Sequence, residues 1–206
     1  LRDYSDGDIW STCDEILCKT EEGRDVPLIR IGNPDAPYAA IFTARHHCSE
    51  TTPSYMMEGV LTYLANNQDS DVFENYCFYA VPIVDVDGVE NGDQGKGRSP
   101  HDHNRDYGIG KYAPTSAIEA LAGTLDFQFA FDIHGPSLRD LGPYFSYYPD
   151  NAEFILAFDK MLIEASENDT TPNKIVYSGK YNRLGEDTAT EQMKAWFHRV
   201  EGAPFA

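Results

Sequence analysis

The sequence has 206 residues, of which 34 are acidic and 16 basic, and its formal net charge is −18. An acidic surface repels phosphate backbones, which argues against nucleic-acid binding, and no apolar run is long enough to span a bilayer. A hydrophobic content of 41% indicates a soluble globular protein, either cytoplasmic or exported, with residues 1–206 forming a single domain.

Short apolar runs alternate with amphipathic segments along the chain. The expected strands are Asp25–Ile31, Tyr38–Ala44, Asn75–Val84, Phe127–Ile133 and Tyr144–Tyr148. The expected helices are Ser54–Asn66, Thr115–Ala122, Ala152–Ala165 and Thr188–Val200. Because the central strands are apolar throughout, the pattern predicts an α/β sheet that is covered by helices on both faces.

Polar residues follow three of these strands at the point where each strand ends. The first strand end carries Arg45–Glu50, the second leads into a loop that ends in His103-Asn104-Arg105, and the third is followed by His134. His101 and His103 compete for any polar role in that loop. Reactive residues of α/β sheets collect beyond the carboxyl ends of the strands, so we expect these side chains to meet.

His47 and Glu50 are three residues apart, a spacing that allows both side chains to face one point. Imidazole nitrogens and carboxylate oxygens are ligands of Zn²⁺. His134 is placed to supply a third ligand. Asp132 could orient a ligand by contacting it on the side away from the metal. His46 competes with His47 for the first position.

Four segments resemble, in order, the carboxypeptidase A-like zinc metallocarboxypeptidases, especially their cytosolic-type and bacterial branches. ARHHCSETTPSYMMEGVLTYL resembles the family's first zinc-ligand segment, an Arg-x-His-x-x-Glu run between a strand and a helix. VPIVDVDGVENGD resembles the segment with proline and glycine that follows the next strand, HDHNRDY the Asn-Arg motif that binds the substrate carboxylate, and FDIHGPS the strand of the third ligand. The matches cover roughly residues 20–137.

The resemblance implies a three-layer α/β/α sandwich around a mixed, mostly parallel sheet. Its register selects His47, Glu50 and His134 as ligands of one Zn²⁺. It assigns the terminal carboxylate of the substrate to Arg105, with Asn104 beside it, and a guanidinium fork suits this task. Arg98 resembles the arginine that stabilises the oxyanion, although its spacing to Asn104 departs from that of the family.

The general base of the family is a glutamate on a late strand, and here no late glutamate stands in such a strand. The late candidates are Glu186, Glu191 and Glu201. The final segment, RVEGAPFA, lies where the family's strand should begin, so we expect the base to lie C-terminal of Ala206 and the domain to lack its C-terminal strand. Tyr177 and Tyr181 are candidates for the family's mobile tyrosine.

The cysteines form no CxxC pair and no metal-binding spacing. Cys13 and Cys18 are close enough in sequence to form a disulfide, whereas Cys48 and Cys77 are expected to be buried thiols.

The expected function is therefore that of a zinc-dependent metallocarboxypeptidase acting on a peptide or small amide with a free carboxylate. An amidohydrolase similar to aspartoacylase and succinylglutamate desuccinylase, acting on N-acyl amino acids, has the same kind of metal site. A zinc-binding relative without catalysis and a structural domain without metal are the remaining alternatives.

Overall fold

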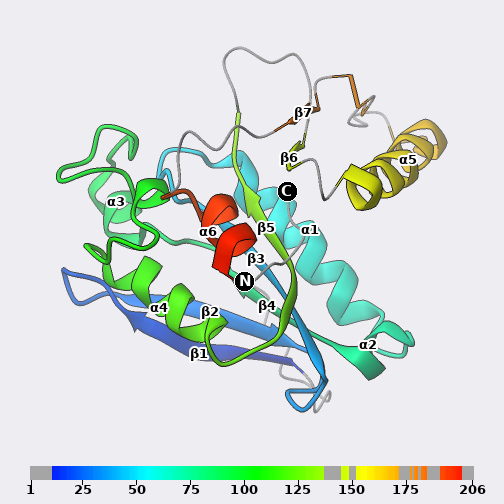
Figure 1. Cartoon of the computed structure of the whole chain (residues 1–206), viewed down its shortest axis with the longest axis horizontal. Coiled ribbons are helices and arrows are strands. Elements are labelled where there is room, and N and C mark those ends of the chain that lie inside the picture. Colours follow the sequence, from blue (N-terminus) through cyan, green and yellow to red (C-terminus); the bar gives the residue numbers. More distant parts are fainter. Residues whose placement is uncertain are drawn as a thin grey trace.

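The computed structural model describes residues 11–136, 145–148, 152–171, 177, 179–180, 182–184 and 191–200. Five strands form one twisted sheet in the order β1-β2-β4-β3-β5 (Figure 1). Their bounds are β1 Ser11–Lys19, β2 Asp25–Ile31, β3 Tyr38–Ala44, β4 Tyr76–Val81 and β5 Phe127–Ile133. β1, β2 and β4 pair antiparallel, whereas β4, β3 and β5 pair parallel, so the described sheet is mixed, as expected.

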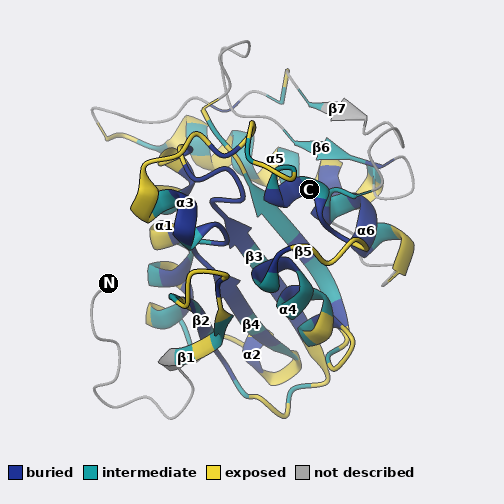
Figure 2. Cartoon of the chain, turned by 90° about the vertical axis from the view of Figure 1, so that its left-hand side faces the viewer, coloured by how far each residue is buried: buried dark blue, intermediate teal, exposed yellow. Residues whose placement is uncertain are grey.

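Helices cover both faces of this sheet. On one face, α4 (Ala113–Ala122) and α6 (Met193–Val200) pack on a buried cluster that includes Ile41 and Val81. On the other face, α1 (Thr52–Asn66) and α2 (Val72–Asn75) pack on a second cluster with Ile29, Ile31 and Ala80. The central strands between these layers are buried (Figure 2). The predicted three-layer α/β/α arrangement is therefore confirmed.

Helix α5 (Ala152–Asn168) contacts the sheet through aromatic side chains. The Phe154 ring lies 4.8 Å from that of Phe129, and the Phe158 ring lies 6.0 Å from that of Phe131, both measured between ring centroids. The remaining described elements are α3 (Val86–Asn91), the 3₁₀ turn η1 (His103–Arg105), β6 (Ser146–Tyr147) and β7 (Arg183–Leu184).

The strands β2, β3 and β5 have the predicted bounds, and the strand expected at Asn75–Val84 is confined to Tyr76–Val81. The helices α1 and α4 begin two residues before their predicted starts, and α5 extends to Asn168. The last helix begins only at Met193, since residues 191 and 192 form a turn, so the predicted start at Thr188 is too early. The strand expected at Tyr144–Tyr148 is limited to Ser146–Tyr147 among the described residues.

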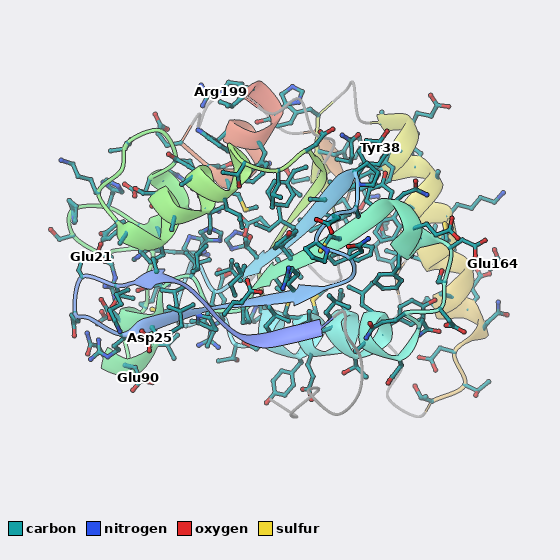
Figure 3. All side chains as sticks on the ribbon, turned by 90° about the horizontal axis from the view of Figure 1, so that it is seen from below. Glu21, Asp25, Tyr38, Glu90, Glu164 and Arg199 are labelled. Atoms are coloured by element: carbon teal, nitrogen blue, oxygen red, sulfur yellow. The ribbon has the colours of Figure 1, made fainter. Side chains whose placement is uncertain are left out.

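The surface carries acidic side chains around its periphery. Glu21, Asp25, Glu90 and Glu164 are exposed and project outward (Figure 3). These four carboxylates are therefore exposed to solvent. Within the described part of the chain, no helix combines the length and the apolar character needed to cross a bilayer.

Cys48 and Cys77 are buried free thiols, as predicted. Cys18 is also a free thiol, and the side chain of Cys13 lies outside the described residues. The structure therefore contains no disulfide at Cys18.

Candidate metal centre

The segment after β3 turns sharply and brings His47 and Glu50 together. Arg45 adopts a positive φ of 62°, and its guanidinium group donates hydrogen bonds to the carbonyl oxygen of Cys48 and, at 3.0 Å, to Ser54 Oγ. The Glu50 N–H donates to the His47 carbonyl at 3.0 Å. As a result, His47 Nδ1 lies 3.1 Å from Glu50 Oε1. A turn ahead of α1, rather than the helix itself, produces the predicted pairing.

His134 reaches the same carboxylate from the end of β5. Its Nδ1 lies 2.8 Å from Glu50 Oε2, and the N–H of Gly135 donates to this oxygen at 3.1 Å. The His47 and His134 rings are 4.8 Å apart, and one ligand atom from each of the three residues lies within 4.8 Å of the others. The structure thus brings together all three residues that the sequence singled out as metal ligands.

Each of these imidazoles has a second carboxylate behind it. Asp132 Oδ2 lies 2.8 Å from Nε2 of His134, and Asp102 Oδ2 lies 3.8 Å from Nε2 of His47. The Nε2 atom of His47 is buried and has no hydrogen-bond partner within the described residues, and the Asp102 carboxylate lies on this side of the ring. When a metal ion is bound, carboxylates on this side favour the tautomer in which Nε2 carries the proton and Nδ1 binds the metal through its lone pair.

The geometry and donor chemistry fit a zinc ion. Two imidazole nitrogens and a carboxylate form a donor set of catalytic zinc sites, and both Nδ1 atoms face the oxygens of Glu50. The orienting role predicted for Asp132 is consistent with its contact to His134. Asp102 had not been singled out in the sequence. Its sequence position, two residues before Asn104, does not indicate a contact with His47, because that contact depends on the path of the loop.

His46 makes different contacts from His47. It is fully buried, with Nδ1 2.8 Å from Asp132 Oδ1 and Nε2 2.8 Å from the Tyr107 hydroxyl. His46, Asp132 and His134 form a second group whose ligand atoms could approach one ion. His46 directs Nε2 to the Tyr107 hydroxyl and Nδ1 toward Asp132, whereas Nδ1 of His47 lies 3.1 Å from Glu50, the carboxylate that Nδ1 of His134 also contacts, so the geometry favours His47.

The electrostatics of the centre favour bound positive charge. Burial alone would raise the pKa of Glu50, but contacts with His134 and His47 keep it far below its usual value. Burial would likewise lower the pKa of His134, yet Asp132 and Glu50 raise it to about 10. The pKa of His47 is also raised, because Asp102 and Glu50 outweigh burial. These carboxylates stabilise positive charge here, which the protonated imidazoles carry in the metal-free protein and a metal ion would carry in their place.

Asn104 connects the centre to α6. Its amide nitrogen donates to Asp132 Oδ2 at 3.0 Å and lies 2.8 Å from Nε2 of His134, while its amide oxygen accepts the N–H of Met193 at 3.0 Å. The side chain of Asn104 therefore positions Asp132, which in turn contacts Nε2 of His134.

Arg105 lies beside Asn104 and donates from Nη1 to its carbonyl oxygen at 2.6 Å. With the amide of Gln192 oriented so that its oxygen faces the guanidinium group, that oxygen accepts from Nη1 and Nη2, both at 3.1 Å. Lys194 is a second cation here. Burial lowers the pKa of Lys194, Asp132 counteracts this, and Arg105 lowers it further. Two basic side chains are thus concentrated next to the candidate metal centre.

Arg98 is bound elsewhere. Its Nη2 lies 2.5 Å from Asp93 Oδ2 and its Nε 3.3 Å from Asp85 Oδ2. In the described structure, its contacts do not include His47, Glu50 or His134. Instead, Lys96 reaches the centre from the same loop, with Nζ 3.0 Å from Glu50 Oε1. No sequence pattern predicts this contact.

Of the late candidates, Tyr181, Glu186 and Glu201 lie outside the described residues. Tyr177 is buried and its hydroxyl group donates to Asp159 of α5, which indicates a packing role. The carbonyl of Glu191 accepts the N–H of Tyr107 at 3.1 Å, which ties this residue's backbone to the loop after η1.

Comparisons with known proteins agree with this geometry. Residues 11–205 match the zinc carboxypeptidase family (peptidase M14). Human cytosolic carboxypeptidase 1 is 33% identical over 107 residues, which cover 45% of this chain and 9% of that protein. A crystal structure of a putative carboxypeptidase A from Shewanella denitrificans has a TM-score of 0.76 at 20% identity, covering 95% of this chain and 54% of the other.

A fold likeness also extends to an aspartoacylase family protein from Mesorhizobium loti, with a TM-score of 0.59 at 15% identity and 96% of this chain covered. The family match over residues 11–205, nearly the whole chain, shows that this chain belongs to the zinc carboxypeptidase family. The chain spans about a tenth of the curated relatives that it matches and about half of the Shewanella structure.

Proposed function

We propose that the protein containing this chain is a zinc-dependent carboxypeptidase that hydrolyses C-terminal peptide bonds. One observation carries the proposal: two imidazoles direct Nδ1 at the two oxygens of Glu50, and each has a carboxylate behind Nε2. His47, Glu50 and His134 would bind one Zn²⁺. When bound, zinc supplies polarisation of the scissile carbonyl and a lowered pKa for the attacking water.

Arg105 is proposed to bind the free carboxylate of the substrate. A guanidinium fork matches a carboxylate geometrically, and the Asn104 carbonyl and Gln192 fix its orientation. Its neighbour Lys194 adds positive charge in a chain whose net charge is −18, so this is a local site for an anion on an acidic protein. Anchoring the terminus makes attack on the adjacent bond effectively intramolecular.

The general base is proposed to be a glutamate C-terminal of Ala206. Among the described residues, the carboxylates at the centre are Glu50, Asp102 and Asp132, and each contacts an imidazole. A carboxylate that orients or accompanies a ligand is poorly placed to accept and transfer a proton. The proton transfer to the leaving amine then requires a further acid–base group.

A second candidate function is hydrolysis of N-acyl amino acids. The likeness to the aspartoacylase family fold supports it, and the same metal centre and Arg105 would serve both reactions. The two differ in what lies on the acyl side of the bond, a peptide in one case and a small acyl group in the other.

The test uses the complete protein purified without added metal. Elemental analysis should find one zinc per chain, and peptides with free C-termini should be cleaved while C-terminally amidated peptides are not. Cleavage of N-acyl amino acids alone would replace the proposal by the deacylase. Zinc without either activity would identify a non-catalytic zinc-binding relative, and lack of zinc binding would refute the metal centre itself.

A further inference from the structure

The loop of residues 92–98 packs directly on the segment that carries His47. Gly95 has a φ of +95°, and a Cβ atom at this position would lie 2.8 Å from the backbone nitrogen of Cys48. Cys48 Sγ donates to the Asp93 carbonyl at 2.9 Å, and Ser49 Oγ donates to the Gln94 carbonyl at 2.8 Å. The backbone just before Lys96 is therefore fixed relative to His47.

From this backbone, the side chain of Lys96 extends to the metal centre. Its Nζ lies 3.0 Å from Glu50 Oε1, the same oxygen that faces His47 Nδ1. The Lys96 side chain is 53% exposed, whereas that of Glu50 is 8% exposed. A long side chain that reaches a buried carboxylate from the solvent side can also contact a substrate bound on that side.

Arg98, two residues later, is kept away by its own contacts. It pairs with Asp85 and Asp93, and a Cβ atom at Gly88 would lie 2.5 Å from Arg98 Nη2, so the guanidinium group is closely packed against α3. Releasing it would break two ion pairs in a half-buried setting. In the described structure, Lys96 is the cation of this loop that reaches Glu50.

We infer that Lys96 is a catalytic residue of the proposed hydrolysis, where its ammonium group stabilises the charge on the scissile carbonyl oxygen. This inference rests on the proposed carboxypeptidase or deacylase function. It gives Lys96 the task that the sequence resemblance assigned to Arg98. It also makes Lys96 a competitor for Glu50, because an ammonium group and a metal ion both bind the same carboxylate oxygen.

The reaction balances without a proton from Lys96. The water oxygen bonds to the carbonyl carbon, and the carbonyl electron pair moves onto its oxygen, where the negative charge develops. The C–N bond then breaks as a proton from the water passes to the amine through the general base. Lys96 remains protonated and acts on the transient oxyanion, an interaction that contributes more in the transition state than in the ground state.

The first measurement is zinc affinity, which does not depend on turnover. Metal-stripped protein is titrated with Zn²⁺ against a chelator of known affinity. Lys96→Met should bind zinc about tenfold more tightly or better, because a positive charge beside Glu50 has been removed. Lys96→Arg should remain close to the parent, and Lys111→Met, which removes a charge from another exposed lysine, should show no change.

The second measurement is kinetic, on the complete protein at saturating zinc. Lys96→Met should lower kcat by roughly 100-fold or more with a small change in KM, as for loss of an oxyanion donor, and Lys96→Arg should restore part of it. Lys111→Met should retain parental kcat. If Lys96→Met keeps parental kcat and zinc affinity, Lys96 forms only a surface ion pair and the inference is overturned.

Different results would refute the proposed hydrolase function and the catalytic role of Lys96. A parent that binds zinc but hydrolyses neither peptides nor N-acyl amino acids refutes the proposed function, and the catalytic role of Lys96 with it. An active parent whose Lys96→Met variant is equally active refutes the inference alone. A change confined to KM would assign Lys96 to substrate binding and would also overturn the oxyanion role.

Discussion

The amide oxygen of Asn104 accepts the N–H of Met193, the first residue of α6, at 3.0 Å. The amide nitrogen of the same side chain donates to Asp132, which in turn contacts Nε2 of His134. A helix near the end of the described chain is thus connected to a candidate ligand through the side chains of Asn104 and Asp132. This arrangement makes the metal centre depend on correct docking of α6.

Asn104→Ala should therefore affect both stability and zinc binding. We expect the free energy of unfolding to fall by about 2–3 kcal/mol, because buried partners lose their hydrogen bonds, and the zinc affinity to fall by about 10- to 100-fold. Urea denaturation and chelator competition measure the two effects. Asn91→Ala, an exposed asparagine on α3 whose amide contacts Glu22, is the control and should change neither. Parental zinc affinity in Asn104→Ala would show that Asn104 does not position His134.

His47 and His46 can be distinguished as ligands by matched substitutions. His47→Gln should abolish stoichiometric zinc binding, because it removes one of three proposed ligands. His46→Gln should destabilise the fold by about 1–3 kcal/mol, since His46 is fully buried between Asp132 and Tyr107, yet retain one zinc per chain. Elemental analysis of both variants, purified at low temperature, measures the zinc content per chain. The reverse pattern would move the ion to the group formed by His46, Asp132 and His134.

The sequence predicted the central strands well because their apolar runs end at clear turns. β3 and β5 have the predicted bounds for this reason. It missed β1, whose charged residues place it at the edge of the sheet. It also missed α3, because this helix depends on distant contacts: its buried Asp87 accepts hydrogen bonds from Thr20 Oγ1 and Arg24 Nη1, both at 2.7 Å.

The same distinction applies to the candidate site. Residue type and strand position were enough to predict that the segments carrying His47, Glu50 and His134 meet, because parallel strands end at one edge of the sheet. The choice of His47 over His46 came from the family resemblance. The partners from the loop after α3 could not be predicted in this way. Whether Asp102, Lys96 or Arg98 faces the centre depends on the path of an irregular loop, which no periodicity encodes.

Arg105 offers a test of substrate recognition. Arg105→Ala should reduce kcat/KM for substrates with a free carboxylate by roughly 100-fold, because a charge-assisted, bidentate contact is lost. Arg105→Lys keeps the charge but loses the fork, so it should recover only part of this activity. Steady-state kinetics on matched free and amidated peptides measure the effect. If both variants discriminate between these peptides as the parent does, Arg105 does not bind the terminus.

His103 should make stability depend on pH. Its side chain is buried and stacked on Tyr112, with ring centroids 3.9 Å apart, and burial lowers its pKa to about 3, helped by the nearby His46 and Arg98. The unfolded chain takes up a proton near pH 6.5, whereas the folded protein does not until about pH 3. Between these values, falling pH favours the unfolded state, by up to about 1.4 kcal/mol per pH unit from this group.

His103→Phe should remove this dependence, because phenylalanine can stack on Tyr112 but does not titrate. Between pH 7 and pH 5, the parent should lose about 2 kcal/mol more stability than the variant, since the other titrating groups are common to both proteins. Urea denaturation of the metal-free proteins at the two pH values measures the difference. Equal losses in the two proteins would mean that His103 is protonated in the folded state, and its buried, neutral character would have to be abandoned.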